Sequence, residues 1–315
     1  MVPHSLRYAV AITGGGEFKD MTADGQISAD VAIAGGGLVG LSLGIALARV
    51  GLDTVVMDGE DPARMRSAEF DGRVCSIAYA SKRVLDGIGV WDGMAAEAEA
   101  ILEIRVSDGD APLFLHYDHR EVGDDPLGWI VENRVTRTAL LEAAAGYARL
   151  RHLAPVSVTE FTPSAERITA ALADGRHISA RLAVAADGRH SLLRRAAGIG
   201  TMDWSYEQTG IVCTVRHARP HRGIAHERFL PGGPFAILPM TGDRASIVWS
   251  EKSDLAPHLL ALDGSDFHAE LASRFGDFLG ELEITGRRWS YPIALTHANR
   301  YGAERLALVG DAAHA

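Results

Sequence analysis

Three consecutive glycines, followed three residues later by a fourth, constrain the fold of this chain more than any other feature of its sequence. Residues 35–40 read GGGLVG, a match to G-x-G-x-x-G, and stand between two apolar runs at 30–34 and 38–50. A strand, a glycine-rich turn and a helix explain this order, and a second strand at 53–57 completes a β-α-β unit. The pattern therefore predicts a dinucleotide-binding unit within an α/β fold.

Each glycine of the pattern has its own task in holding a dinucleotide. Gly35 permits the tight turn, Gly37 lets a pyrophosphate approach the backbone, and Gly40 lets the helix pack closely on the strand. The start of the helix offers unpaired N–H groups and a positive dipole to the phosphates. Asp58, at the end of the second strand, is placed to accept hydrogen bonds from an adenosine ribose. The motif alone does not choose between NAD and FAD.

Composition narrows the class of protein. The 315 residues carry a formal net charge of −10 and are 47% hydrophobic, as in ordinary globular proteins, and the acidic balance argues against nucleic acid as the main partner. Two cysteines make neither a disulfide framework nor a metal site, so we expect no metal and a reducing, cytoplasmic location.

The uncharged run 31–48 is long enough for a membrane span, but its three consecutive glycines favour a strand, a turn and a helix over a membrane-spanning helix.

Two further predicted strands each end in a carboxylate. Residues 182–186 read LAVAA and lead into Asp187-Gly188, after which Ser191 can cap a helix. Residues 306–309 read LALV and lead into Gly310-Asp311, where the carboxylate could accept hydrogen bonds from sugar-like hydroxyls. Open α/β sheets bind ligands at the carboxyl ends of their strands. Either motif alone is an ordinary turn, and the specific signal is the order and spacing of all three.

The middle of the chain has a different pattern. Residues 210–251 alternate apolar with polar side chains and are broken repeatedly by proline and glycine. The segments 211–215, 235–238 and 245–249 are typical strands of a mostly antiparallel sheet. Because the style of a buried strand returns at 306–309, we predict an α/β domain interrupted by a β-rich domain.

With the three motifs in this order, the sequence resembles the class A flavoprotein monooxygenases, the aromatic hydroxylases, over about residues 29–315. The resemblance implies a para-hydroxybenzoate-hydroxylase-like fold, in which a Rossmann-like FAD-binding domain carries an inserted, mostly antiparallel β-sheet substrate domain. It assigns Asp187 to the FAD pyrophosphate and the path of NAD(P)H, and Asp311 with Gly310 to the ribityl chain. The residues that it assigns to the ADP half of FAD are Gly35, Gly37, Gly40 and Asp58.

Within the class, the sequence is most similar to the ubiquinone-biosynthesis hydroxylases. Residues 71–73 resemble their D-x-R segment and place Arg73 near the FAD, and residues 131–134 resemble their V-E-N stretch. The latter places Asn133 and Arg137 beside the cofactor. Arg73 and Arg137 could instead be solvated or salt-bridged arginines without a role at the cofactor. Residues 221–225, 227–229 and 233–239 resemble the strands that line the substrate pocket of the family. The candidates for that pocket are Phe235, Leu238 and Pro239.

The resemblance also divides the chain. We expect the FAD-binding domain to comprise 29–105, 129–205 and 296–315, and the substrate domain to comprise 106–128 and 206–295. Residues 1–28 have no periodic pattern and are expected to be a disordered extension. Members of the family continue past their Gly-Asp motif into a proline-containing segment and a helix that faces the flavin. We therefore expect a C-terminally truncated chain that binds FAD weakly and turns over poorly.

The implied activity is hydroxylation of an aromatic ring, with a polyprenyl phenol of ubiquinone biosynthesis as the lipophilic substrate. NAD(P)H reduces FAD, O2 gives the flavin C4a-hydroperoxide, and no catalytic side chain is required. An apolar pocket excludes the water that would release hydrogen peroxide. A polyprenyl substrate implies contact with the inner face of the membrane or with biosynthetic partner proteins. The alternatives are a flavin-dependent reductase or halogenase, a non-catalytic FAD-binding remnant and a plain NAD dehydrogenase.

Overall fold

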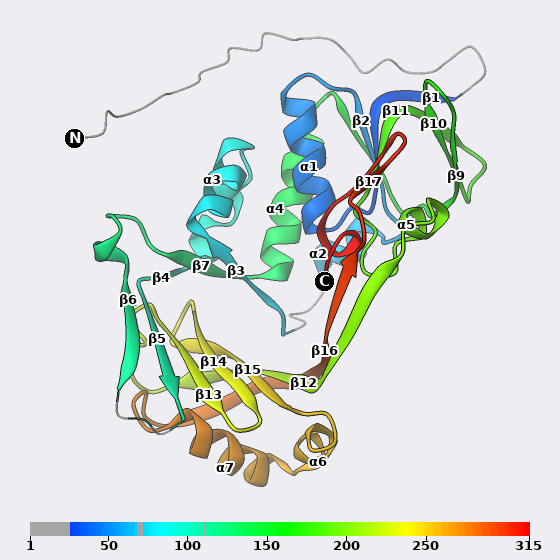
Figure 1. Ribbon diagram of the computed structural model, residues 1–315. Helices are drawn as coiled ribbons and strands as arrows, with labels where there is room; N and C mark the ends of the chain where they lie inside the picture. The colour runs from blue at the N-terminus through cyan, green and yellow to red at the C-terminus, as the bar shows by residue number, and fades with distance from the viewer. Residues whose placement is uncertain (1–25, 68–71, 110, 112) are drawn as a thin grey trace.

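The computed structural model describes residues 26–67, 72–109, 111 and 113–315, which form two large sheets and one small sheet (Figure 1). Residues 1–25 of the expected extension lie outside the described residues, while Ile27 and Ser28 already belong to the first strand. None of the helices in the described part of the chain is long and apolar enough to cross a membrane. The run 31–48 is instead divided among a strand, a turn and a helix.

The first large sheet has the order β17-β18-β11-β1-β2-β8, with β10 and β9 added beside β11. Its central strands β18, β11, β1, β2 and β8 are all parallel, so their carboxyl ends meet along one edge. The strands are β1 (Ile27–Ala34), β2 (Thr54–Met57), β8 (Leu150–Leu153), β9 (Val158–Pro163), β10 (Ile168–Leu172), β11 (His177–Ala185), β17 (Gly302–Ala303) and β18 (Leu306–Leu308).

Both faces of this sheet are covered, one by helices and the other mainly by two strands. One face packs against α1 (Leu38–Arg49) and α4 (Asn133–Ala145), which bury Leu41, Ile45 and Leu140 against the strands (Figure 1). The other face is covered by β9, β10 and α5 (Leu192–Ala196). Shorter elements flank the sheet: α2 (Pro62–Ser67), α3 (Tyr79–Gly87) and the small antiparallel sheet of β3 (Val74–Ala78), β7 (Gly128–Glu132) and β4 (Glu99–Ile101).

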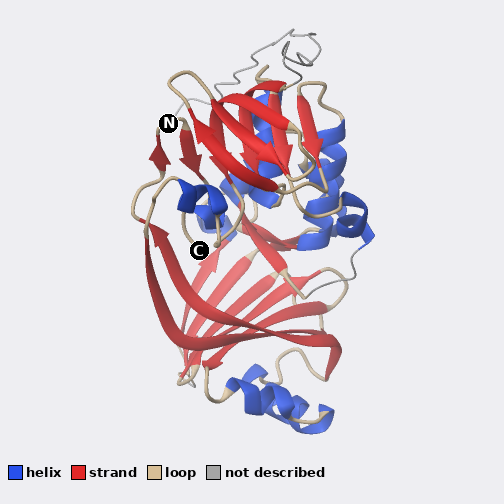
Figure 2. Ribbon diagram, turned by 90° about the vertical axis from the view of Figure 1, so that its right-hand side faces the viewer, coloured by secondary structure: helices blue, strands red, loops and turns tan. Residues whose placement is uncertain are grey.

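The second large sheet has the order β16-β12-β15-β14-β13-β5-β6 and is antiparallel except between β13 and β5. Its outer face is covered by α6 (Ala256–Ala261) and α7 (Gly264–Phe275), and its inner face is turned toward the first sheet (Figures 1 and 2). The predicted mostly antiparallel sheet is thereby confirmed. Its strands are β5 (Glu103–Asp108), β6 (Phe114–Asp118), β12 (Thr201–His217), β13 (Ile224–Leu230), β14 (Gly233–Met240), β15 (Arg244–Lys252) and β16 (Leu282–Ala298).

Two long strands join the two halves of the molecule. β12 and β16 have 17 residues each and run together from the second sheet up to the first (Figure 1). Their register shifts between Ser205 and Gln208, where Glu207 has a φ of 54°. The domain limits expected at 205/206 and 295/296 therefore fall inside continuous strands, and β5 starts at Glu103, before the expected limit at 106.

Candidate cofactor and substrate site

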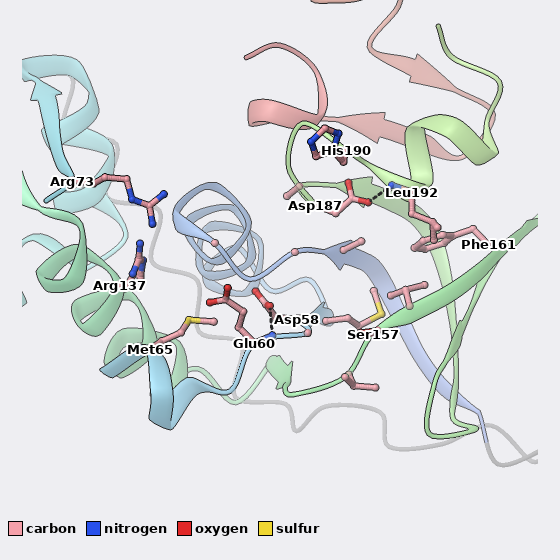
Figure 3. A pocket seen from close by; sticks show the side chains of 18 residues that line it. Asp58, Glu60, Met65, Arg73, Arg137, Ser157, Phe161, Asp187, His190 and Leu192 are labelled. Atoms are coloured by element: carbon pink, nitrogen blue, oxygen red, sulfur yellow. Dashed lines mark hydrogen bonds between the residues drawn. The ribbon is translucent and has the colours of Figure 1, made fainter. Parts of the chain in front are cut away.

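A cavity of about 580 Å³ lies at the carboxyl ends of β1, β2 and β11, beside the start of α1 (Figure 3). Apolar side chains form part of its wall, among them Met57, Val156 and Phe161 from the core on the face that β9, β10 and α5 cover. The cavity brings together several residues that the sequence placed at the cofactor. These are Gly35, Gly37, Asp58, Arg73, Arg137 and Asp187.

The glycine-rich turn is held by close backbone contacts. Gly35 has a φ of 102°, and a Cβ atom there would lie 2.2 Å from the carbonyl oxygen of Ala186, in the second motif. A Cβ atom on Gly40 would lie 1.9 Å from the carbonyl oxygen of Gly35. A Cβ atom on Gly37 would meet nothing within 4 Å. Two of the glycines are thus required by the protein itself, whereas the space beside Gly37 remains open for a ligand.

Asp58 ties the end of β2 to the same turn. Its Oδ2 accepts a hydrogen bond from the backbone N–H of Gly36 at 2.5 Å, and its Oδ1 accepts one from Glu60 at 2.8 Å (Figure 3). Sequence reasoning missed His152 of β8, whose Nε2 would lie 2.9 Å from a Cβ atom on Gly36. This nitrogen is buried without a hydrogen-bond partner among the described residues, and burial lowers the pKa of His152. No local pattern around His152 marks it in the sequence.

Two arginines close the cavity on the side away from β11. Arg73 precedes β3 and Arg137 lies on α4, and their guanidinium groups extend toward each other into the cavity (Figure 3). Guanidinium groups match phosphate oxygens in charge and in hydrogen-bond geometry. The arrangement therefore gives the cavity a positively charged wall opposite the carboxylate of Asp58.

Asp187 caps the helix that follows the second motif. Its Oδ2 accepts a hydrogen bond from Leu192 N–H at 2.8 Å, while its buried Oδ1 has no partner among the described residues. Ser191 accepts from Arg194 N–H at 3.0 Å, as its predicted capping role requires. The buried Arg194 side chain then donates to the carbonyl of Ala312 at 2.8 Å. This bond fastens the second motif to the third.

The third motif, Gly310-Asp311, lies against the start of α1, directly after the glycine-rich turn. Gly310 has a φ of 57°, and a Cβ atom there would lie 3.1 Å from the side chain of Val39 on the first turn of α1. Asp311 follows with an exposed side chain on a 3-10 turn, and neither Gly310 nor Asp311 lines the cavity. Asn133 also lies outside the cavity wall, at the start of α4, where its Oδ1 accepts from the Cys75 thiol at 2.9 Å. The structure thus separates the predicted site residues into a cavity group and a flanking group.

The inner face of the second sheet carries one continuous row of paired residues. Cross-strand register joins the members of the row from the edge strand β6 to β16. They are Leu115, Val106, Glu227, Ala236, Val248, Val212 and Trp289. The last ring of the row lies against Gly72, directly before Arg73, because a Cβ atom on Gly72 would lie 2.2 Å from the Trp289 ring. An almost wholly apolar track therefore leads from an exposed edge to the cofactor side.

The predicted substrate pocket is only partly on this face. Leu238 packs toward the small sheet with Ala225, Met240 and Ile130, so it faces the cofactor half of the molecule. Phe235 is fully buried on the opposite face, in the core with Trp249 and under α7. Alternation along β14 puts Pro239 on the face of Phe235. The structure does not bring the three together, because neighbouring positions of a strand point to opposite faces.

Comparisons with known proteins agree with this architecture. Residues 28–315 match the family model described as FAD binding domain. The chain is 51% identical over 294 residues to the ubiquinone hydroxylase UbiL of Rhodospirillum rubrum, over 93% of this chain and 68% of that protein. It is 31% identical to 3-demethoxyubiquinol 3-hydroxylase of Escherichia coli, over 90% of this chain and 73% of that protein. Pseudomonas aeruginosa PqsL, solved in complex with 2-aminobenzoylacetate, superimposes with a TM-score of 0.78 at 25% identity, over 91% and 79% of the two chains.

The two large sheets, the family match and the solved relative define an FAD-dependent monooxygenase of the para-hydroxybenzoate-hydroxylase-like fold. Within this class, the chain belongs to the family of the ubiquinone hydroxylases. The resemblance stated from the motifs is therefore confirmed, and so are FAD as the cofactor and hydroxylation as the type of reaction. NAD(P)H is the reductant typical of the family. The match to an FAD-binding family removes the alternative of a plain NAD dehydrogenase.

Proposed function

We propose that this protein hydroxylates the ring of a polyprenyl phenol between its cofactor half and the inner face of its second sheet. The observation that carries the proposal is the row from Leu115 to Trp289, which is apolar at every position but Glu227. Seven strands at about 4.8 Å spacing make the row roughly 29 Å long. That length suits a substrate with an aromatic head and a long hydrocarbon tail. The relatives named for ubiquinone and demethoxyubiquinol hydroxylation support the same substrate class.

The cavity residues fit the ADP half of FAD. The open space at Gly37 accommodates a pyrophosphate beside the start of α1, and Arg73 and Arg137 supply positive charge there. The buried, partnerless Oδ1 of Asp187 offers an acceptor for a donor on the ligand. Asp58 would bind the ribose, while Gly310 and Asp311 would lie along the ribityl chain. When bound, FAD would pass the electrons of NAD(P)H to O2, so that one oxygen atom of O2 can enter the ring.

The domain division belongs to the same proposal. The first sheet with α1 and α4 would form the FAD-binding domain, and the second sheet with α6 and α7 would form the substrate domain. The small sheet of β3, β7 and β4 contacts the inner face of the second sheet through Ile130 and Leu238. It would fix the distance between the flavin and the substrate.

Quinone-intermediate profiling tests the substrate class. A strain that lacks this protein should accumulate a prenylated phenol one hydroxyl short of its normal product, and restoring the gene should remove that intermediate. An unchanged profile after deletion would overturn the assignment to ubiquinone biosynthesis, while the monooxygenase class would stand on the family match.

We further propose that the edge strand β6 touches the membrane that supplies the substrate. Apolar side chains on this strand and next to it are strongly exposed. Leu115 and Tyr117 on β6 are 63% and 52% exposed, and the flanking Leu113 and Val122 are 82% and 80% exposed. The patch is continuous with the apolar row because Leu115 is its first member. A lipid surface would place the protein at the inner face of the membrane and would let a tail enter the row from its open end.

Flotation with phosphatidylcholine vesicles tests this contact. The double substitution Leu113→Ser and Leu115→Ser should reduce the vesicle-bound fraction severalfold, because about 0.8 kcal/mol is lost for each buried CH2 group. The matched control is Val84→Ser, at a similarly exposed site on α3, 58% exposed, which should change nothing. Equal vesicle binding by the double variant and by Val84→Ser would contradict the proposed membrane contact.

A further inference from the structure

Glu227 is the single ionisable residue among the described members of the apolar row. Its cross-strand neighbours are Val106 on β5 and Ala236 on β14, and its neighbours on the same face of β13 are Ala225 and Phe229. Ala225 packs toward the small sheet, so this face of β13 is turned to the cofactor half of the molecule. The carboxylate therefore stands in an apolar wall on the side where the substrate is proposed to bind.

The Glu227 carboxylate has no hydrogen bond or ion pair with any described residue. Burial raises the pKa of Glu227, and no charged neighbour among the described residues counteracts this effect. His226 and Arg228, the adjacent residues of β13, alternate to the opposite face, toward α7. By contrast, Glu132 is buried with two partners, since Arg134 and Arg244 donate to it at 2.5 and 3.0 Å. A half-buried carboxylate without a partner reduces stability, so the fold alone does not explain its position.

We infer that Glu227 accepts the proton of the substrate's phenolic hydroxyl and so activates the ring toward oxygen transfer. This inference rests on the proposed function, which brings a phenol to the inner face. The O–H bond breaks, the proton joins a carboxylate oxygen, and the electron pair stays on the phenolate oxygen and spreads into the ring. The ring then presents more electron density to the incoming oxygen atom. O2 and NAD(P)H remain the oxidant and reductant of the established reaction.

The apolar surroundings suit this role. A carboxylate in water is a far weaker base than a phenolate, because the pKa of a phenol is about 10. Burial narrows that difference because it raises the pKa of Glu227. Removal of water also strengthens the hydrogen bond from the phenol to the carboxylate. The wall thus supplies the apolar fit for the substrate, and Glu227 supplies one polar contact that fixes the orientation of the ring.

The test uses protein saturated with FAD and the probe 2-farnesylphenol, a phenol with a short prenyl chain. Glu227→Gln keeps the shape of the side chain but cannot accept a proton. We expect probe binding to stay within about threefold, and hydroxylation at neutral pH to fall by about a hundredfold, the usual contribution of a general base. The wild-type rate should fall at acidic pH, as the carboxylate becomes protonated, and this acid limb should be absent in the variant.

The matched control is Glu283→Gln on the edge strand β16, whose exposed carboxylate pairs only loosely with Arg216, at 3.6 Å. It should keep both the rate and the acid limb. If Glu227→Gln hydroxylates at the wild-type rate with the same pH profile, the assignment of Glu227 is wrong and the proposed function stands. If wild-type protein binds FAD but neither binds nor hydroxylates the probe, the proposed function is wrong, and the inference about Glu227 is then wrong as well. A melting temperature for Glu227→Gln at or above that of wild type excludes misfolding as the cause of a lost rate.

Discussion

At the scale of single residues, the glycine-rich turn separates what the fold needs from what the cofactor needs. Gly35→Ala should destabilise the protein by about 2–4 kcal/mol, because φ is 102° and the new Cβ would meet the Ala186 carbonyl at 2.2 Å. Gly37→Ala should leave the stability unchanged, since φ is −69° and nothing lies within 4 Å. It should nevertheless weaken FAD binding at least about tenfold, because the methyl group takes the place of the pyrophosphate.

Thermal melting of the FAD-free variants and fluorescence titration with FAD check this pair of substitutions. The melting temperature should fall in Gly35→Ala only. Gly37→Ala should keep its melting temperature and lose affinity for FAD. Tight FAD binding by Gly37→Ala would show that the phosphates lie elsewhere.

His226 makes the stability dependent on pH. Burial, with Arg105 and Arg228 nearby, lowers its pKa to about 4 from the ordinary value of 6.5. The folded state thus favours neutral His226, and its contribution is fully present above about pH 6.5. It is lost as the pH falls toward 4, by on the order of 2–3 kcal/mol at 1.36 kcal/mol per pKa unit. His226→Gln should lack this component.

Urea denaturation at several pH values between 7 and 4 measures the difference between His226→Gln and wild type. Between pH 7 and 4 the stability of wild type should fall relative to that of the variant by this amount, whatever their difference at neutral pH. Two parallel curves would contradict the account of His226.

Sequence reasoning at this scale is strongest where the chemistry is local. Gly35, Gly40 and Asp58 lie within one β-α-β unit, so a spacing rule singles them out, and the close contacts at the two glycines are confirmed. Phe235 was misplaced because strand alternation gives two faces and the sequence does not say which face meets the cofactor. His152 carries no pattern at all. It reaches the turn only because β8 pairs with β2, which a single sequence does not reveal.

At the scale of elements, the shift in register between β12 and β16 is the joint between the two halves. Glu207 lies there with a φ of 54°, a backbone conformation that disfavours β-branched residues. Glu207→Ile should therefore destabilise the protein by about 1–2 kcal/mol, although the side chain is exposed. Glu207→Asn should stay within about 0.5 kcal/mol, because asparagine tolerates this conformation.

Chemical denaturation of both variants measures the effect at the joint. Equal stabilities of Glu207→Ile and Glu207→Asn would mean that the backbone at this position accommodates a β-branched residue without strain. A loss confined to Glu207→Ile would identify the backbone, not the lost carboxylate, as its cause.

Local patterns predicted the first β-α-β unit and several strands of both large sheets, but they missed the extents of these elements. Helix α3, Tyr79–Gly87, ends early because the chain turns at Gly89, with a φ of 75°, before a separate 3-10 turn. The strand expected at 211–215 is the 17-residue β12, whose first half is mostly exposed and so lacks a buried pattern. The small sheet of β3, β7 and β4 was not expected, since its strands pair across long stretches of chain.

At the scale of the whole molecule, three distant segments of chain form one proposed cofactor site. Because FAD would bind only the folded state, it should raise the stability by about 2.7 kcal/mol at a concentration of 100 Kd. FMN lacks the AMP part of FAD, which the cavity would hold beside the pyrophosphate, so it should stabilise far less. Thermal shifts with each flavin, and with ADP as a competitor, measure this. Equal stabilisation by FMN and FAD would contradict the assignment of the cavity.

The central claim is that this protein is an FAD-dependent hydroxylase of a lipophilic phenol, and incorporation of 18O tests it most directly. Protein saturated with FAD is supplied with NAD(P)H, 18O2 and 2-farnesylphenol, and the product is analysed by mass spectrometry. The account predicts a hydroxylated product that carries one 18O atom from O2, in an amount that falls when Glu227 is replaced by Gln. Consumption of NAD(P)H with all the oxygen recovered as hydrogen peroxide, and no labelled product, would contradict it.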